Sequence, residues 1–509
     1  KCWGFGWSGQ LGSENIGPHS TYSGYFGLRR EPVRDLPYVG LLWAFPLSWL
    51  DTTVPVLPSA TTTLGGEVVF VSTAWRYACY LAASGDVGCW GSNAHGNLGL
   101  GDTVSRGDPS EMGKNLPYVR LGLGRSAQSI SVGDVSACAI LDNQELKCWG
   151  WAPGYGDQEV RGDRAPRVVW SDEDGAYRME SDMGDDLPAI DLGSGRTARS
   201  VAVGRREHCA VLDNNRLKCW GGALQTEEDP ADEMGDDLPY VDLGSGRTVK
   251  AISMAHVSGY SSSLGEVSSY CAILDNDRLK CWGWAPGYGD SVARGSTPGD
   301  TGGDLPYLNI GSDDNLSRVT AVAVSPEHVC AILLPNNRIK CWGSNGSGQL
   351  GLGDTLTRGR SSGTMGDNLP YVDLGTGRTA KSLAVGSKYS CALLDNDRVK
   401  CWGRGFAGEN GAGTGFSVGD SPGSMGDALP YVDLGSGRTV KSLHSGGGSR
   451  LHTCVVLDND GIKCWGGNVG IYGSAGRPGG GSVGTSAMHM GDNLPYIQLP
   501  SGSKLSVTE

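Results

Sequence analysis

The sequence predicts an all-β fold, a single β-propeller built of four-stranded antiparallel blades. The first observation behind this is a repeat, because the tripeptide Cys-Trp-Gly occurs eight times in 509 residues at intervals of 59 to 87 residues. The second is the marker Leu-Pro-Tyr, which occurs seven times, with Leu-Pro-Ala once in an eighth copy. The third is the turn chemistry between short apolar segments, which is typical of β-hairpins.

The repeat at residues 371–403 shows how each element of a blade follows from its residues. Gly375 and Gly377 tolerate a positive φ and predict one turn, and Asp395-Asn396-Asp397 predicts a tight hairpin turn. The four strands expected around these turns are Tyr371–Leu374, Lys381–Val385, Ser390–Leu394 and Arg398–Trp402. Helical solenoids would need a 3.6-residue periodicity that is absent here.

Counting complete hairpins sets the number of blades. Seven of them lie within residues 67–500, so we expect a seven-bladed ring there. Residues 1–66 form a partial repeat with a divergent loop, and residues 501–509 resemble the strand that opens a further repeat. If the two ends met, they would supply three strands of an eighth blade, which is the alternative count. Because the chain starts at Lys1 without Met, we expect it to be a segment of a longer protein.

Fourteen of the fifteen cysteines fall into seven pairs, six separated by ten positions and one by eleven. Folding back at the Asp-Asn turn brings the two cysteines of a pair onto facing strands, within disulfide distance. The predicted bonds are Cys79–Cys89, Cys138–Cys148, Cys209–Cys219, Cys271–Cys281, Cys330–Cys341, Cys391–Cys401 and Cys454–Cys464. Zinc binding and free buried thiols are the alternatives, but no Cys-x-x-Cys is present and no His recurs at ligand spacing. Seven such pairs favour an oxidising compartment. The partner of Cys2 would lie upstream of the chain.

The loops that follow Cys-Trp-Gly carry a family resemblance. The segments GSNAHGNLGLGDT (residues 91–103) and GSNGSGQLGLGDT (residues 343–355) resemble the repeat of the regulator-of-chromosome-condensation family. The resemblance implies a β-propeller, usually of seven blades. The cysteine pattern and the phrase LPYVDLGSGRT resemble a secreted, flagellar-surface subset from green algae, which includes mastigoneme-type glycoproteins. The light-sensing Gly-Trp-Arg-His-Thr motif of the plant ultraviolet-B photoreceptor is absent, and only Trp75-Arg76 is similar.

The remaining recurring residues predict structural roles. The Trp beside each hairpin cysteine should face the opposite side of the sheet and pack against the next blade. The position just before the hairpin cysteine holds either His or Tyr, which suggests a role in packing and in turn hydrogen bonds. The Arg after the Gly-x-Gly turn should reach an acid such as Asp373 or a strand-end carbonyl. These recurring residues are His208, His328, His452, Tyr77, Tyr270, Tyr389, Arg196, Arg247, Arg378 and Arg438. The six Met-Gly steps before Leu-Pro predict gap-filling by Met.

Trp-Ala-Pro-Gly-Tyr-Gly occurs twice, at residues 151–156 and 284–289. Exposed loop aromatics can bind sugars or partners, but local loop packing is the favoured interpretation. Two glycosylation sequons, at Asn315 and Asn345, fall in predicted loops.

Composition excludes several classes of function. The net charge of −13 and the scattered Arg pairs do not indicate nucleic-acid binding. No apolar stretch is long enough for a membrane helix. No catalytic motif, phosphate-binding loop or metal site is found, so we expect no enzyme activity and no cofactor.

We therefore expect a non-enzymatic extracellular scaffold within a larger cell-surface or filament assembly. Its expected partners are neighbouring proteins, with glycans and copies of the same chain as further candidates. Nucleotide exchange on a small GTPase, implied by the family's founding member, and a secreted glycan- or protein-binding module are the alternatives.

Overall fold

A computed structural model describes residues 67–500, apart from residues 75, 152–159, 162–166, 172–175, 181, 222–233, 258–266, 285–286, 293, 296–300, 312–317, 447–451 and 469–480. The chain divides into two compact units, Lys1–Thr62 and Thr63–Glu509, and every described residue lies in the second. The terminal segments 1–66 and 501–509, with Cys2, Trp75 and Asn315, lie outside the described residues.

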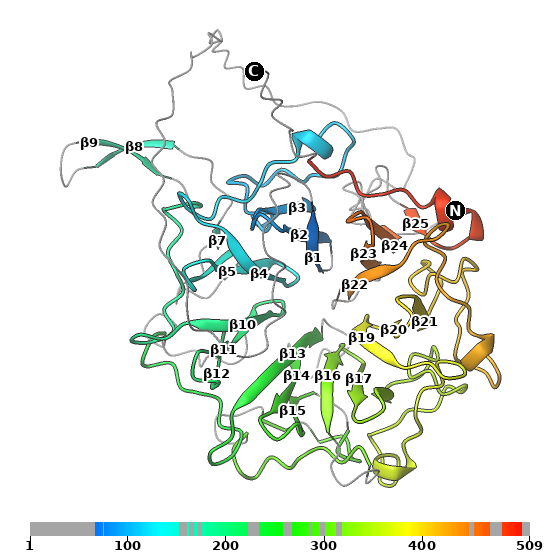
Figure 1. Cartoon of the computed structure of the whole chain (residues 1–509). Helices are drawn as coiled ribbons and strands as arrows, with labels where there is room; N and C mark the ends of the chain where they lie inside the picture. Colours follow the sequence, from blue (N-terminus) through cyan, green and yellow to red (C-terminus); the bar gives the residue numbers. More distant parts are fainter. Residues whose placement is uncertain are drawn as a thin grey trace, which may run out of the picture. The chain divides into compact units, whose positions relative to one another are not determined.

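The described part of the second unit is all-β and contains seven repeated antiparallel sheets, five of three strands and two of four. We number these sheets blade 1 to blade 7 in chain order. Each blade begins with an inner strand near the centre of the ring (Figure 1). The inner strands are β1 (Val68–Thr73), β4 (Ala127–Val132), β10 (Ala198–Val203), β13 (Val249–Val257), β16 (Val319–Val324), β19 (Ala380–Val385) and β22 (Val440–Ser445).

The middle strand of each blade pairs with both of its neighbours. The middle strands are β2 (Tyr77–Ala82), β5 (Ser136–Leu141), β11 (Glu207–Leu212), β14 (Val267–Leu274), β17 (His328–Leu333), β20 (Tyr389–Leu394) and β23 (His452–Leu457). The third strands are β3 (Val87–Gly91), β6 (Leu146–Trp151), β12 (Leu217–Gly221), β15 (Leu279–Gly283), β18 (Arg338–Gly343), β21 (Val399–Gly403) and β24 (Ile462–Asn468). Because both of its edges and both of its faces are covered, the middle strand is buried along its whole length, as in β2, β5 and β20.

The predicted fourth strand Arg398–Trp402 is formed as β21, and beyond the third strand the structure adds an edge strand that was not predicted. Among the described residues, blades 2 and 7 have this edge strand, β7 (Val160–Arg161) and β25 (Gly481–Val483). In blades 1, 4, 5 and 6 it is reduced to a single bridge, such as Gly403 to Val418. The expected strand Tyr371–Leu374 is not formed; its Val372 amide donates to Ile339 O of β18 (2.8 Å), but no ladder follows. A Pro at 370 and an Asx turn at Asp373 leave too few amides for a ladder.

The hairpin turn between the middle and third strands agrees with the prediction. Its third residue takes a positive φ in six blades, as at Asp397 (φ 58°), and Gly85 takes that place in blade 1. Asx residues adopt this left-handed conformation more readily than other side chains do. Short elements outside the blades are the hairpin β8 (Arg167–Ser171) and β9 (Ala176–Glu180), and the 3-10 turns η1 (Gly113–Asn115), η4 (Gly366–Asn368), η5 (Gly426–Ala428), η6 (Ala487–His489) and η7 (Gly491–Asn493).

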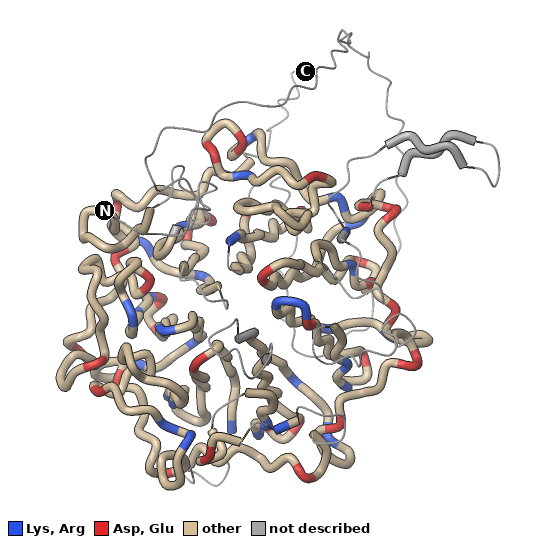
Figure 2. The backbone as a smooth tube through the Cα atoms, turned by 180° about the vertical axis from the view of Figure 1, so that it is seen from behind, with Lys and Arg blue, Asp and Glu red and all other residues tan. Residues whose placement is uncertain are grey.

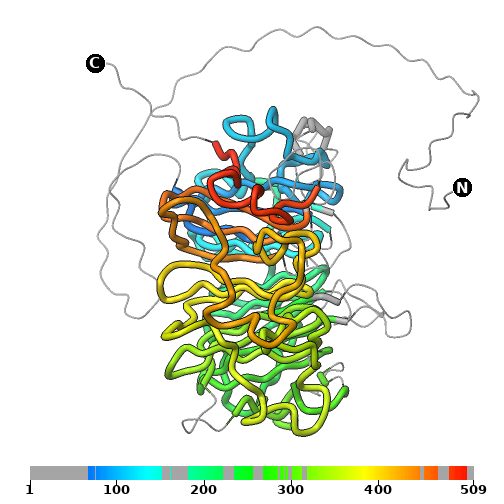
Figure 3. The backbone as a smooth tube through the Cα atoms, turned by 90° about the vertical axis from the view of Figure 1, so that its right-hand side faces the viewer, coloured from blue at the N-terminus to red at the C-terminus, as the bar shows by residue number. Residues whose placement is uncertain are grey.

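The seven inner strands contact one another in sequence, and β22 of blade 7 contacts β1 of blade 1. The last blade therefore lies against the first and completes the ring (Figures 1 and 3). Val68 and Val71 of β1 share a core with Val456 of β23 and Ile462 of β24, so apolar packing makes this closure. Seven blades form the ring in the part of the chain that the structure describes. Within the described residues no helix has the length and hydropathy to cross a membrane.

Candidate functional site

Each blade carries one disulfide between its middle and third strands. The seven bonds are Cys79–Cys89, Cys138–Cys148, Cys209–Cys219, Cys271–Cys281, Cys330–Cys341, Cys391–Cys401 and Cys454–Cys464, the pairs that the spacing predicts. The two cysteines are direct cross-strand partners, as at Cys391 and Cys401, whose Cα atoms lie 4.0 Å apart. Bonds of this kind are made and kept in oxidising compartments, so the seven disulfides indicate an extracellular setting.

The disulfides do not face solvent but form part of the cores between blades. The Cys330–Cys341 bond of blade 5, for example, lies in one cluster with Trp402 of blade 6. The same arrangement recurs at all seven junctions, including the closure, where Cys454 and Cys464 share a cluster with Trp90. Each junction therefore combines the disulfide of one blade with the Trp of the blade that follows.

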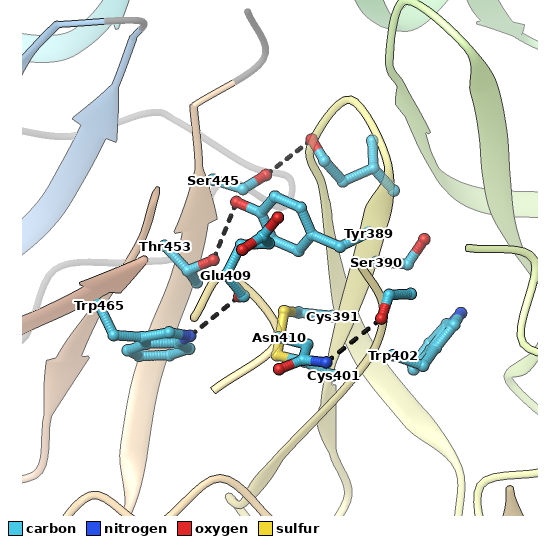
Figure 4. Close-up of a disulfide and its surroundings, with 12 residues drawn as sticks. Tyr389, Ser390, Cys391, Cys401, Trp402, Glu409, Asn410, Ser445, Thr453 and Trp465 are labelled. Atoms are coloured by element: carbon cyan, nitrogen blue, oxygen red, sulfur yellow. Dashed lines mark hydrogen bonds between the residues drawn. A yellow bond between two sulfur atoms is a disulfide. The ribbon is translucent and has the colours of Figure 1, made fainter. Parts of the chain in front are cut away.

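The direction of the Trp packing differs from the sequence prediction. Alternation along the strand does place Trp and Cys on opposite faces, as expected. However, the Trp packs against the preceding blade and not the next one. The Trp402 indole N–H donates to Gln349 O (3.0 Å), and the Trp465 indole N–H donates to Glu409 O (3.1 Å; Figure 4). The glycine-rich loop of one blade thus supplies the acceptor for the next blade's indole.

The expected His/Tyr position is in fact two positions on opposite faces. Tyr389 stands two residues before its cysteine and points to the next blade, where its hydroxyl donates to His452 O (3.0 Å) and accepts from Thr453 Oγ1 (3.0 Å; Figure 4). Tyr270 stands one residue before its cysteine and stacks on Trp282 of its own blade, with ring centroids 5.3 Å apart. Their hydrogen bonding and packing agree with a structural role.

Comparison with known proteins matches these repeats. Residues 319–349 and 380–409 match the model of the Regulator of chromosome condensation (RCC1) repeat. These two matched segments lie in blades 5 and 6 of the propeller. The chain is 25% identical over 278 residues to the Ultraviolet-B receptor UVR8 of Arabidopsis thaliana, covering 54% of this chain and 52% of the receptor. It is 28% identical over 193 residues to the E3 ubiquitin-protein ligase HERC2 of Mus musculus, covering 37% of this chain and 4% of the ligase.

The chain thus spans about half the length of the plant receptor and a small part of the ligase. Among solved structures, Prp20p from Saccharomyces cerevisiae aligns with a TM-score of 0.48 and 17% identity, covering 75% of this chain and 80% of that one.

Six of the blades contain a buried lysine whose role was not predicted from the sequence. Each of these lysines precedes a hairpin cysteine and is at most 6% exposed; they are Lys147, Lys218, Lys280, Lys340, Lys400 and Lys463. The Lys400 ammonium donates to Leu374 O of the preceding Leu-Pro segment (3.0 Å) and to Gly426 O (2.8 Å). It also lies 4.8 Å from the ring centroid of Tyr431. Burial lowers the pKa of Lys400.

This lysine joins consecutive repeats at the rim. The sequence signal for its role is a charged residue that recurs in a strand expected to be buried. Lys precedes Cys-Trp-Gly in seven of the eight copies, and Gly88 takes its place in blade 1. Since an ammonium is almost never buried without partners, that recurrence predicts acceptors around it.

Other recurring polar residues stabilise turns on the rim. Asp427 accepts from the amide (2.9 Å) and the hydroxyl (2.6 Å) of Thr376 in the Gly-x-Gly turn. Arg378 pairs with Asp395 of the hairpin turn (3.2 Å), and not with Asp373 as suggested from sequence. The same Arg–Asp pairing recurs at Arg196, Arg247 and Arg438. The Met side chains before Leu-Pro are buried or half-buried, in line with gap-filling. Figure 2 shows Lys and Arg interspersed with Asp and Glu around the ring.

The sequon at Asn345 does not have the expected accessibility. Asn345 is 0% exposed, its amide nitrogen donates to Asp354 O (2.8 Å), and its amide oxygen accepts from Leu350 N (2.9 Å). A glycan on that nitrogen would disrupt the loop, so Asn345 is a structural residue that Asn93 matches in blade 1. Within the described residues, no group of three or more His, Cys, Asp or Glu side chains is placed to hold a metal ion.

Proposed function

We propose that this chain is a non-enzymatic extracellular scaffold, a disulfide-stapled RCC1-repeat propeller that forms part of a larger cell-surface or filament assembly. The observation that carries the proposal is the position of the disulfides within the cores between blades. A disulfide there holds a hairpin in register and stabilises the surface on which the next blade packs. Such a disc would resist mechanical and chemical stress outside the cell, which suits a structural part.

The rest of the molecule supports a role in contact with neighbours. The recurring charged and aromatic residues serve the repeat itself, as the Lys400 and Asp427 contacts illustrate. The loops after Cys-Trp-Gly also expose apolar side chains, among them Leu356 (64%), Phe406 (65%) and Phe416 (69%). Neighbouring protein subunits, glycans and copies of this chain are the partners that we propose.

The location of the native protein tests this function. Antibodies against the folded chain should label cells that have not been permeabilised, and immuno-electron microscopy should place the label outside the plasma membrane. Cross-linking of that material should then recover the chain bound to other surface proteins or to itself. Label confined to the cytosol or nucleus would contradict the proposal.

A further inference from the structure

Loops of three blades meet around the side chain of Trp151. Trp151 ends β6 of blade 2 and is half-buried. The His95 ring, from the glycine-rich loop of blade 1, stacks on it with centroids 5.1 Å apart and planes 28° apart. The Arg206 guanidinium, from the turn before β11 of blade 3, lies 4.0 Å from the centroid of the Trp151 ring. The indole thus holds the guanidinium in place by cation–π contact.

Positive charge gathers at this point of an acidic chain. Arg205 neighbours Arg206, and Arg76 lies in the turn before β2 of blade 1. Burial lowers the pKa of His95, and the charges of Arg205, Arg206 and Arg76 lower it further. The whole chain carries a net charge of −13, which makes such a grouping unusual for this protein.

The Arg206 side chain is half-buried, and its guanidinium forms no ion pair among the described residues. Its Nε–H is buried without a hydrogen-bond partner, so a ligand would use the terminal N–H groups. Stacking on an indole occupies the face of the guanidinium and leaves the in-plane N–H groups unused. The nearest acid in sequence, Glu207, is 1% exposed, and one of its oxygens accepts from the Arg206 backbone amide (3.3 Å).

The second copy of the same hexapeptide has a different arrangement, in which the Arg360 guanidinium lies 5.4 Å from the centroid of the Trp284 ring. Trp284 of blade 4 takes the place of Trp151, but the residue before the middle strand of the next blade is Glu327 instead of Arg206. Glu327 lies 3.5 Å from the Lys388 ammonium. The two copies therefore differ in the charge at the position before the next blade's middle strand, which is Arg206 in one and Glu327 in the other.

We propose that Arg206, positioned by Trp151 and assisted by Arg76 and Arg205, binds the carboxylate or sulfate group of an acidic glycan. A guanidinium fork matches the two oxygens of such groups. The observed contact presents one guanidinium on one indole, which suits a single anionic group. The choice of a glycan rests on the extracellular scaffold proposed above.

The test is calorimetric titration of the purified, oxidised chain with four probes. These are a heparin-type oligosaccharide carrying sulfate, an oligogalacturonate carrying carboxylate, a neutral dextran fragment and a poly-glutamate peptide. We expect at least one of the two acidic oligosaccharides to bind and the dextran not to bind. Binding should weaken when the salt is raised from about 50 mM to about 500 mM.

Variants locate the site. Arg206→Glu should weaken binding at least about tenfold, which corresponds to ~1.4 kcal/mol, and Trp151→Ala should weaken it in the same direction. Trp284→Ala and Glu327→Gln are the matched controls and should bind like the parent chain. Circular dichroism and the melting temperature establish that each variant is folded.

Several results would overturn the site: no binding of either acidic probe, equal binding of dextran, tighter binding of poly-glutamate, or unchanged affinity in Arg206→Glu. None of these results would change the antibody labelling that tests the scaffold proposal. Intracellular label, in contrast, would remove the scaffold while leaving the titration as a measured property.

Discussion

At the scale of single residues, the buried lysines show how one side chain joins two repeats. Lys400 is 2% exposed and satisfies two carbonyl groups, Leu374 O and Gly426 O, that come from consecutive turns of the rim. Removing the ammonium leaves both acceptors unpaired in a buried place.

The first prediction concerns this lysine. Lys400→Met should lower the free energy of unfolding by about 2–4 kcal/mol, because two buried carbonyls lose their donor. Lys381→Met is the control, since Lys381 is about half exposed and its pair with Asp397 (2.6 Å) contributes little. Thermal melts followed by circular dichroism compare the two. Equal melting temperatures would show that the Lys400 contacts do not stabilise the ring.

The second prediction concerns acid. Burial lowers the pKa of His208 and His452 to about 4 and that of His328 to about 3. An unfolded His titrates near pH 6.5, so between that pH and about 4 the unfolded chain binds more protons than the folded one. Stability should therefore be full above about pH 7 and fall as the pH drops through this window, by roughly 2 kcal/mol per His at pH 5.

His452 offers the sharpest check of that window, because neither of its ring nitrogens has a hydrogen-bond partner. His452→Phe should lose less of its melting temperature between pH 7 and pH 5 than the parent chain does. An unchanged loss would mean that other groups control the acid response.

At the residue scale, sequence reasoning predicted types of role better than partners. The Arg after Gly-x-Gly was expected to pair with an acid, and it does, but with Asp395 and not Asp373. Local spacing cannot say which of two nearby turns folds back over a side chain. The expected accessibility of the Asn345 sequon was wrong for a similar reason, because a position in a loop does not determine whether the side-chain amide faces inward.

At the scale of the element, the hairpin is the unit that the sequence specifies most fully. The paired cysteines, the Asx turn and the alternation of Cys with Trp all depend on neighbours within about ten positions, so periodicity reveals them. The direction in which Trp402 packs, and the single bridge that Val418 forms with Gly403, depend on how whole blades meet. A single repeat does not contain that information.

The third prediction tests the hairpin staple. Replacing Cys391 and Cys401 by Ala should lower the free energy of unfolding by about 2–4 kcal/mol, because the closed loop of about 11 residues no longer constrains the unfolded chain. Ser382→Ala in the adjacent strand β19 is the control, since its hydroxyl has no partner and should matter by about 0.5 kcal/mol or less. A double variant as stable as the control would show that packing alone holds the hairpin.

At the scale of the whole molecule, the ring is a chain of equivalent junctions. Each joins the disulfide of one blade to the Trp of the next, and the seventh closes between blades 7 and 1 through the same cluster type. Counting hairpins predicted seven blades, because each hairpin brings its own inner strand and Leu-Pro segment. The sequence could not exclude an eighth from the terminal repeats, and the observed closure of β22 on β1 decides the count.

The most direct test of the account is mass spectrometry of the intact, non-reduced native chain with peptide mapping. The account predicts seven disulfides, each within one hairpin, as in Cys391–Cys401. Free thiols at these positions in native material, or bonds that join different blades, would contradict it.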